Sequence, residues 1–152
     1  MNKLQKGFYQ NSAVNLAPEF LRKYLVFNSP KGKVSGKIIE VEAYPAYLDK
    51  VSHGNKRTKR TEIMYREGGF VYVYLIYGMF HQFAVVVNKK DVPEVVFIRA
   101  VIPEVGVDTM KQNFGRSVKS DLDLAKSPGN LCKAFGINMS LYGADLTKCN
   151  LP

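Results

Sequence analysis

Two glutamates stand two residues apart in KIIEVEAY, residues 37–44, a stretch whose branched apolar residues predict a β-strand. Because side chains alternate along a strand, Glu40 and Glu42 are expected to share a face with Tyr44, their carboxylates roughly 6.5–7 Å apart. His53 follows after a short loop. A carboxylate, a tyrosine and a histidine that meet in one site can activate a water or protonate a leaving group. The alternative is that both glutamates face solvent, and for the pair alone that interpretation is favoured.

A cluster of cations follows in HGNKRTKRT, residues 53–61, where Lys56, Arg57, Lys59 and Arg60 occupy four of five consecutive positions. Such a cluster suits nucleic-acid phosphates, because each contact releases condensed counterions. The whole chain is basic as well, with 22 lysines and arginines against 13 acidic residues and a formal net charge of +9. A small basic domain often binds a polyanion, most commonly nucleic acid. Basic residues that serve only solubility are the alternative, and composition favours neither.

Three tyrosines lie in YVYLIYG, residues 72–78. Tyr72 and Tyr74 share one face of the predicted strand, whereas Tyr77 has the opposite parity and precedes Gly78. Tyr74 is therefore suited to stack on a base in a groove, and Tyr77 to project from the turn as a wedge between stacked bases. Packing within the sheet is the alternative role, and it is the commoner one for tyrosines in strands.

The spacing of apolar residues predicts the elements that position these groups. A helix is expected within residues 11–27, with Pro18 near its start, and strands over 34–44, 70–78, 81–88 and 94–103. Two more helices are expected over 104–114 and 127–136. The second has Ser127 as its N-cap, Pro128 in its first position and Gly136 as its stop. Residues 45–69 are expected to be mostly loop, with a short helix near 60–66.

In the strand over 34–44, the alternation assigns Ile39, Val41 and Ala43 to the core face. The strands over 81–88 and 94–103 flank KKDVP, which predicts a β-hairpin. The order of elements indicates the α+β class, with a mostly antiparallel sheet and short helices in one domain over residues 1–152.

The composition of the chain also indicates the cellular compartment of the protein. No apolar run approaches the roughly 20 residues that span a bilayer, and the N-terminus has no apolar signal region, so no membrane association is expected. Cys132 and Cys149 lack metal or redox spacing and are interpreted as buried thiols rather than a disulfide. A cytoplasmic protein is expected, associated with the nucleoid in a bacterium or located in the nucleus of a eukaryote.

The chain resembles the alkyladenine (3-methyladenine) DNA glycosylases, the methylpurine glycosylase family of base-excision repair. The segments that carry the resemblance follow the family's order through most of residues 7–142. They are IIEVEAYPAYLDKVSHGNKRTKRTEIMY, GFVYVYLIYGMFH, EVVFIRAVIP and SPGNLCKAFGI. The combination of E-A-Y, a downstream histidine and Y-x-Y-x-x-Y-G-M is specific, whereas each piece alone is weak.

The resemblance implies a compact fold around a curved, mostly antiparallel sheet with short flanking helices. It also implies a monofunctional glycosylase with no metal and no cofactor. Its partner would be double-stranded DNA containing alkylated purines, and no obligate protein partner is expected. By motif position, Glu42 resembles the general base that activates water for attack at the sugar C1′. Glu40 has no part in this chemistry and is interpreted as a structural or solvent-facing acid. Arg99 corresponds to an arginine that positions this water and a nearby phosphate. The chemistry agrees, because an alkylated purine is already a cationic leaving group and needs little acid catalysis.

The resemblance also implies a pocket for a flipped base, with Tyr44, His53 and Tyr74 as its walls and hydrogen-bonding groups. An aromatic pocket favours a cationic base over a neutral one. Tyr77 would fill the gap that the flipped nucleotide leaves in the duplex. The basic loop, with its lysines and arginines at 56, 57, 59 and 60, would contact the phosphate backbone.

Two positions depart from the family pattern. The family usually has an asparagine on the pocket floor, which disfavours guanine by crowding its exocyclic amine; counting from Tyr77, this position is Ala84 here. We therefore predict a roomier base pocket that accepts N7- or N3-alkylguanine more readily. The usual G-P-x-K helix start reads S-P-G-N at 127–130, so a basic phosphate contact is expected to be lost at Asn130.

Family members usually continue with a Pro-Arg-Ile/Val-Gly segment that closes the pocket, and this sequence ends with GADLTKCNLP, residues 143–152. The chain is then a naturally shortened member, a frameshifted remnant or a piece of a longer product, and its activity is expected to suffer if the pocket wall is missing. An inactive DNA-binding relative is therefore one alternative. A glycoside hydrolase using Glu40 and Glu42 is a weaker one, because their spacing exceeds the roughly 5–5.5 Å of retaining enzymes.

Overall fold

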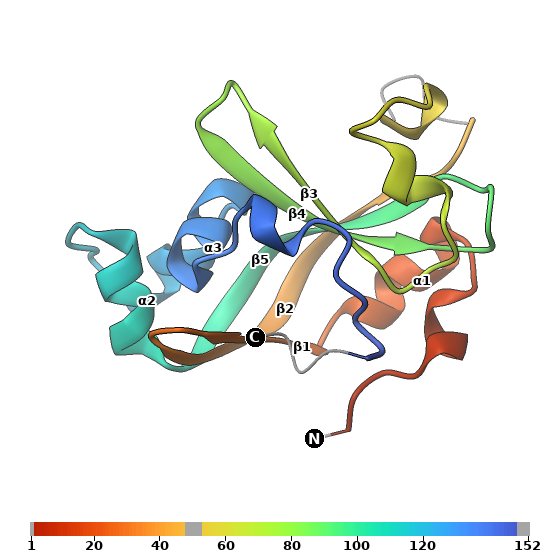
Figure 1. Cartoon of the computed structure of the whole chain (residues 1–152). Coiled ribbons are helices and arrows are strands. Elements are labelled where there is room, and N and C mark those ends of the chain that lie inside the picture. The colour runs from red at the N-terminus through yellow and green to blue at the C-terminus, as the bar shows by residue number, and fades with distance from the viewer. Residues whose placement is uncertain (1, 48–52, 149–152) are drawn as a thin grey trace.

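The computed structural model describes residues 2–47 and 53–148, which fold around one antiparallel sheet (Figure 1). Its strands are β1 (Tyr24–Ser29), β2 (Gly32–Tyr44), β3 (Val71–Ile76), β4 (Phe80–Val87) and β5 (Glu94–Val105). The α-helices are α1 (Ala13–Phe20), α2 (Val107–Phe114) and α3 (Pro128–Phe135). Short 3-10 helices are η1 (Lys6–Tyr9), η2 (His53–Asn55), η3 (Glu62–Tyr65), η4 (Asp121–Ala125) and η5 (Met139–Leu141). The α+β class predicted from the sequence is confirmed.

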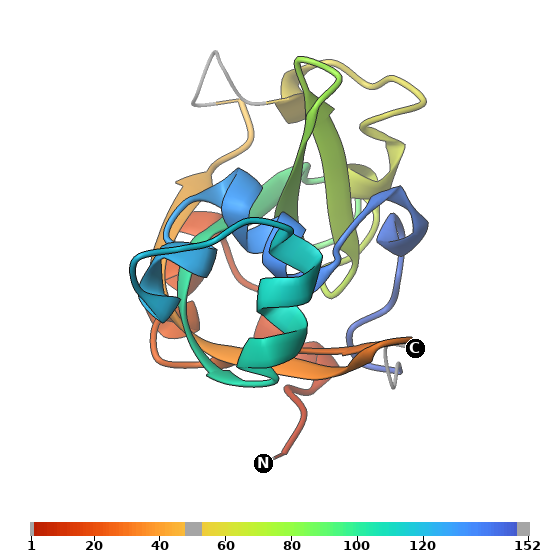
Figure 2. The same cartoon turned by 90° about the vertical axis from the view of Figure 1, so that its left-hand side faces the viewer.

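The strands lie in the order β1-β2-β5-β4-β3, and each neighbouring pair is antiparallel. The predicted hairpin on either side of KKDVP is the β4–β5 pair, which places β5 between β4 and β2. The sheet is strongly curled: the β3–β4 hairpin turns away from the β1–β2 ribbon in both views (Figures 1 and 2). The curl leaves one face for the helices and a second face for another cluster of side chains.

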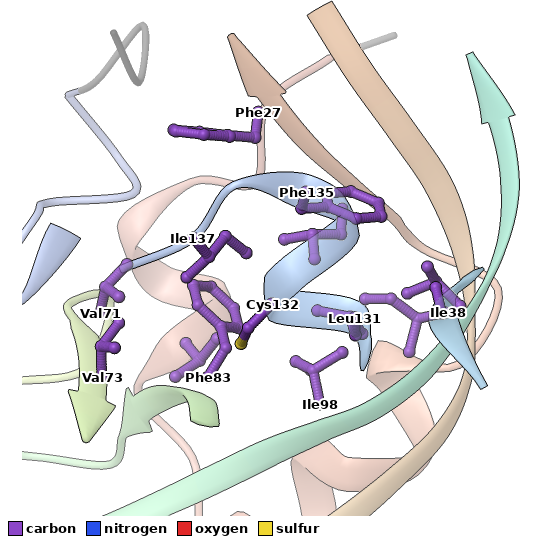
Figure 3. Close-up of a cluster of buried hydrophobic side chains, with 14 of the residues drawn as sticks. Phe27, Ile38, Val71, Val73, Phe83, Ile98, Leu131, Cys132, Phe135 and Ile137 are labelled. Carbon is purple, nitrogen blue, oxygen red and sulfur yellow. The ribbon is translucent and has the colours of Figure 1, made fainter. Parts of the chain in front are cut away.

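The main hydrophobic core lies between the sheet and the helices (Figure 3). Helix α3 contributes Leu131, Cys132 and Phe135, which join Phe83 of β4 and Ile98 of β5 in one buried cluster. Full burial of such a large apolar side chain stabilises the fold by about 1.5–3 kcal/mol. Burial also raises the pKa of the Cys132 thiol to about 12, so the thiol stays protonated. Cys132 is buried as predicted, and the second cysteine lies outside the described residues.

A second, smaller cluster occupies the other face of β3, β4 and β5. Its buried members are Ile63, Met64, Phe70, Tyr72, Tyr74, Ala84, Val86, Val95 and Phe97. The strand residues among them alternate with the residues of the main core, as the period of two requires. The aromatic side chains predicted to do chemistry therefore belong to a face that is separate from the helical layer.

The first helix is shorter than predicted. It ends at Phe20, and Leu25 and Val26 lie in β1, where their branched and apolar neighbours suit a strand. Arg22, with φ at 67°, turns the chain between the two elements. Pro18 lies inside α1, in its last turn, so the prediction that it begins the helix is wrong. Because proline has no N–H to donate to the carbonyl of Val14, α1 lacks one helical hydrogen bond there.

Strand β2 carries a bulge that changes which side chains are buried. The register shifts between Ile38 and Glu40, whose partners on β5 are adjacent residues, so Ile39 is an extra residue. Ile38 is consequently buried in the core, whereas Ile39 is 49% exposed. The predicted core face is therefore wrong for Ile39. Val41 and Ala43 pack against the main core as predicted.

The later helices are close to their predicted positions. Helix α2 begins at Val107 rather than at residue 104, because β5 continues to Val105 and Gly106 breaks the strand with φ at 74°. Helix α3 begins at Pro128 and ends before Gly136, as predicted. None of the helices in residues 2–47 and 53–148 is long and apolar enough to cross a membrane.

Candidate functional site

The site is built on a row of side chains that crosses the sheet. Glu42 of β2 pairs with Phe97 of β5, Phe97 pairs with Ala84 of β4, and Ala84 pairs with Tyr72 of β3. Directly paired residues of antiparallel strands lie on the same face, with Cβ atoms about 4.5–5.5 Å apart. The row therefore begins at a carboxylate, crosses an aromatic ring and an alanine, and ends at a phenol.

A cavity of about 110 Å³ lies over this row. Its lining residues are Tyr44, His53, Met64, Tyr72, Tyr74, Ala84, Val95 and Phe97. All four residues that the sequence assigned to the base pocket, at positions 44, 53, 74 and 84, are in this lining. Tyr72 and Phe97 were not assigned to it. The parity of Tyr72 with Tyr74 could have found the first, whereas Phe97 is placed by pairing between strands that are distant in sequence.

The cavity walls are aromatic and uncharged. The ring of Tyr74 lies 4.7 Å from that of His53 in an edge-on arrangement, and 5.0 Å from that of Tyr72 in a stacked one. Phe97 lies 6.3 Å from Tyr74 and 6.4 Å from Tyr44. Burial, followed by the neighbouring phenols, raises the pKa of Tyr74 well above its ordinary value. The tyrosine therefore stays neutral and offers an electron-rich ring.

Arg99 of β5 links Glu40 and Glu42 of β2. Its Nε donates to Glu40 Oε1 at 2.9 Å, and its Nη1 donates to Glu42 Oε2 at 2.8 Å. A second bulge makes this possible, because Glu40 pairs with Ala100 and Val41 with Ile98, which leaves Arg99 as the extra residue of β5. The bond to Glu40, and then the charge of Glu42, raise the pKa of Arg99.

The ion pairs of Arg99 are partly exposed, with 45% of the Glu42 side chain open to solvent. Such pairs contribute only about 0–1 kcal/mol to stability, so their main effect here is on geometry. Glu40, which the sequence left as a structural or solvent-facing acid, binds one edge of the guanidinium. Glu42 receives a single hydrogen bond from Arg99 and keeps a partly open carboxylate beside the aromatic row.

The basic loop divides into two parts. Lys56 and Lys59 are exposed. Arg57 is exposed as well, and its Nε donates to Glu62 Oε2 at 2.9 Å. Arg60 differs, because its guanidinium contacts a residue that lines the cavity: its Nε donates to the Tyr72 hydroxyl at 3.2 Å. The structure therefore brings one of the four predicted phosphate contacts into the site.

Tyr77 lies at the tip of the β3–β4 hairpin, away from the cavity lining. Tyr77 and Gly78 have φ values of 52° and 64°, and the Met79 N–H bonds to the Ile76 carbonyl at 3.0 Å. The loop between the paired residues Ile76 and Phe80 has three residues, and the turn Ile76–Met79 within it has positive φ at both central positions, as in a type I′ turn, which favours Asn-Gly. The Tyr77 side chain is nevertheless 90% exposed. The hairpin tip and the basic loop lie on the same side of the molecule in both views (Figures 1 and 2).

Asn130 is the last position that the sequence singled out. It lies in the first turn of α3, and its side-chain amide donates to the Asp123 carbonyl at 3.4 Å. This chain therefore has, in place of the lysine of the family motif, an asparagine whose side chain bonds to the backbone of Asp123. A phosphate contact from this position is not expected.

Comparisons with known proteins identify relatives of the chain. A family model described as methylpurine-DNA glycosylase matches residues 7–151. Three proteins named "Putative 3-methyladenine DNA glycosylase" are similar along most of their length. That of Natranaerobius thermophilus is 47% identical over 148 residues, covering 95% of this chain and 74% of the relative. Those of Clostridium novyi and Bacillus subtilis are each 41% identical, covering 99% and 97% of this chain and 79% and 74% of the relatives.

Proposed function

The chain belongs to the methylpurine-DNA glycosylase family, and we propose that it releases alkylated purines from duplex DNA by hydrolysing the N-glycosidic bond. One observation carries this proposal: an aromatic cavity lies directly beside a carboxylate that an arginine holds in place. The cavity suits a purine, and the carboxylate suits the activation of water. No other cluster in the described residues combines these two features.

The substrate would enter the cavity as a flipped nucleotide, because the bond to be cleaved is inaccessible inside a base stack. Damaged bases stack and pair less well, so flipping contributes to selectivity. The electron-rich rings of Tyr44 and Tyr74 then favour a cationic alkylpurine through cation–π attraction. Ala84, which is fully buried at the cavity floor, leaves room for an exocyclic amine.

Glu42 would act as the general base. Its carboxylate takes a proton from a water whose oxygen forms a bond to the sugar C1′, while the bond from C1′ to the purine nitrogen breaks. The electron pair of that bond stays on the purine, which leaves neutral because it was cationic. The same negative charge stabilises the oxocarbenium-like transition state. Arg99 would hold Glu42 and orient the water, and Glu40 would hold Arg99 from its other edge.

The DNA duplex would lie across the side of the molecule that carries the hairpin tip and the basic loop. Tyr77 is the proposed wedge, because its exposed ring stands on a tight turn whose backbone is defined. Lys56 and Lys59 are proposed to contact phosphates directly. Arg57 would reach a phosphate only by releasing or sharing its bond with Glu62.

The test is a release assay on duplex DNA that contains alkylated purines. The chain is incubated with the duplex, and free purines and alkali-labile sites are measured alongside binding at matched salt. The proposal expects purine release and abasic sites, with no release from unmodified DNA. Tight binding without release would overturn the enzymatic function and identify a DNA-binding relative.

A further inference from the structure

Arg60 belongs to the basic loop, yet its guanidinium lies against the base pocket. Its Nε donates to the Tyr72 hydroxyl at 3.2 Å, and its Nη2 lies 3.3 Å from His53 Nδ1. Its Cζ is 5.2 Å from the centre of the Tyr74 ring. The Tyr72 hydroxyl itself lies 3.2 Å from His53 Nδ1. These contacts close a triangle between an arginine, a phenol and an imidazole.

The loop backbone holds Arg60 in this position. The Tyr142 hydroxyl donates to the Arg60 carbonyl at 2.8 Å and accepts from the Ile63 N–H at 3.3 Å. Thr61, which is buried, donates from its hydroxyl to the Lys56 carbonyl at 2.7 Å. The loop is therefore tied to Tyr142, which directly follows η5, and to itself through Thr61. The placement of the guanidinium follows from a defined backbone.

The hydrogen-bonding capacities of the three groups determine where the imidazole carries its proton. A guanidinium can only donate, so its contact with His53 requires a lone pair on Nδ1. The Tyr72 oxygen accepts from Arg60 Nε, and its own hydrogen is then free to donate to the same Nδ1. A histidine whose Nδ1 accepts is neutral and carries its hydrogen on Nε2.

We propose that Arg60 is a positioning residue of the base pocket, which keeps His53 neutral with its proton on Nε2 and so presents an N–H donor to the bound base. The consequence for the base rests on the proposed function. A base that offers a lone pair to Nε2 gains a hydrogen bond, whereas one that offers an amine hydrogen does not. This role lies inside the pocket and is distinct from the phosphate contact predicted for Arg60.

The other groups around the imidazole are consistent with this assignment. Tyr44, Tyr72 and Tyr74 share the cavity lining with His53. Burial raises the pKa of Tyr72 and Tyr74, so neither phenol carries a negative charge that would attract a proton to the imidazole. Glu42 lies two residues before Tyr44 on β2 and bonds to Arg99. Partial burial, and then the charge of Arg60, lower the pKa of His53.

The experiment is an NMR titration of the free protein, which contains two histidines, His53 and His81. The ring nitrogen shifts of His53 report the tautomer, and their pH dependence gives its pKa. We expect an unprotonated Nδ1 in the wild type at neutral pH. In Arg60→Gln we expect the pKa of His53 to rise and a second tautomer to become populated. Lys59→Gln, which removes the same charge one position away, should leave both properties unchanged.

Two results would overturn the proposal: a proton on Nδ1 in the wild type, or an Arg60→Gln protein in which the tautomer and the titration of His53 are those of the wild type. Because the measurement uses the protein without DNA, it is independent of glycosylase activity. If the release assay finds no glycosylase activity, the titration still decides the role of Arg60. If the titration contradicts the role of Arg60, the release assay still decides the enzymatic function.

Discussion

At the tip of the β3–β4 hairpin, we expect Tyr77 to lower the stability of the fold while it serves DNA binding. A residue other than glycine, asparagine or aspartate is destabilised by about 1–2 kcal/mol in the left-handed backbone region, and Tyr77 has φ at 52°. The ring recovers little of this cost, because 90% of the residue is exposed. Tyr77→Asn would place Asn-Gly in the type I′ turn, which is the pair that this turn favours.

We expect Tyr77→Asn to increase the free energy of unfolding by about 1 kcal/mol, which corresponds to a rise in Tm of about 2–4 °C for a chain of this size. Urea and thermal unfolding measure this change. The same substitution removes the proposed wedge, so purine release from duplex DNA should fall under single-turnover conditions. Tyr77→Phe is the matched control, because it keeps both the ring and the backbone strain.

The two halves of this prediction fail separately. A Tyr77→Asn protein no more stable than the wild type would refute the argument from backbone strain. A variant that is more stable yet releases purines at the wild-type rate would refute the role of Tyr77 as a wedge. Tyr77→Phe should match the wild type in both assays.

Three further substitutions test the pocket and the fold. Ala84→Asn should lower release of alkylguanine relative to alkyladenine, because the longer side chain crowds the exocyclic amine; an unchanged ratio in a paired release assay would sink this idea. Phe83→Ala should cost about 3–5 kcal/mol of unfolding free energy in urea titrations, because Phe83 is 1% exposed in the main core. Glu94→Ala should lower the free energy of unfolding by at least about 2 kcal/mol, because the buried carboxylate accepts hydrogen bonds from the N–H groups of Ala13 and Ala46. A decrease below about 1 kcal/mol would contradict this expectation.

The pocket residues were assigned by the resemblance to the methylpurine glycosylases, whose motifs lie in short, strongly patterned segments of this chain. Tyr44 and Tyr74 follow the alternation of their strands, and His53 follows the first strand after a short loop. The fold class and the β4–β5 hairpin were predictable for the same reason: each depends on local patterns and turn residues. What these patterns lack is information about which strands pair and in which register.

The errors arise where pairing between distant segments decides the structure. Two bulges between β2 and β5 bury Ile38, expose Ile39 and turn Arg99 toward both glutamates. Alternation within a single strand cannot reveal a bulge, because a bulge exists only relative to a partner strand. For this reason Glu40 was interpreted as a bystander, and the structure gives it a role in holding the arginine. Arg60 is a similar case, since loop geometry decides whether a cation faces solvent or a pocket.

The central claim is that one carboxylate, Glu42, activates the water, while Glu40 only positions Arg99. The most direct test is single-turnover release of an alkylated purine from duplex DNA by the wild type, Glu42→Gln and Glu40→Gln, with DNA binding measured for each. General-base catalysis contributes about 10²- to 10⁴-fold, so Glu42→Gln should lose at least about a hundredfold in release rate while still binding DNA. Glu40→Gln should retain a clearly larger share of the rate. A Glu42→Gln protein that releases the base at close to the wild-type rate would contradict the account.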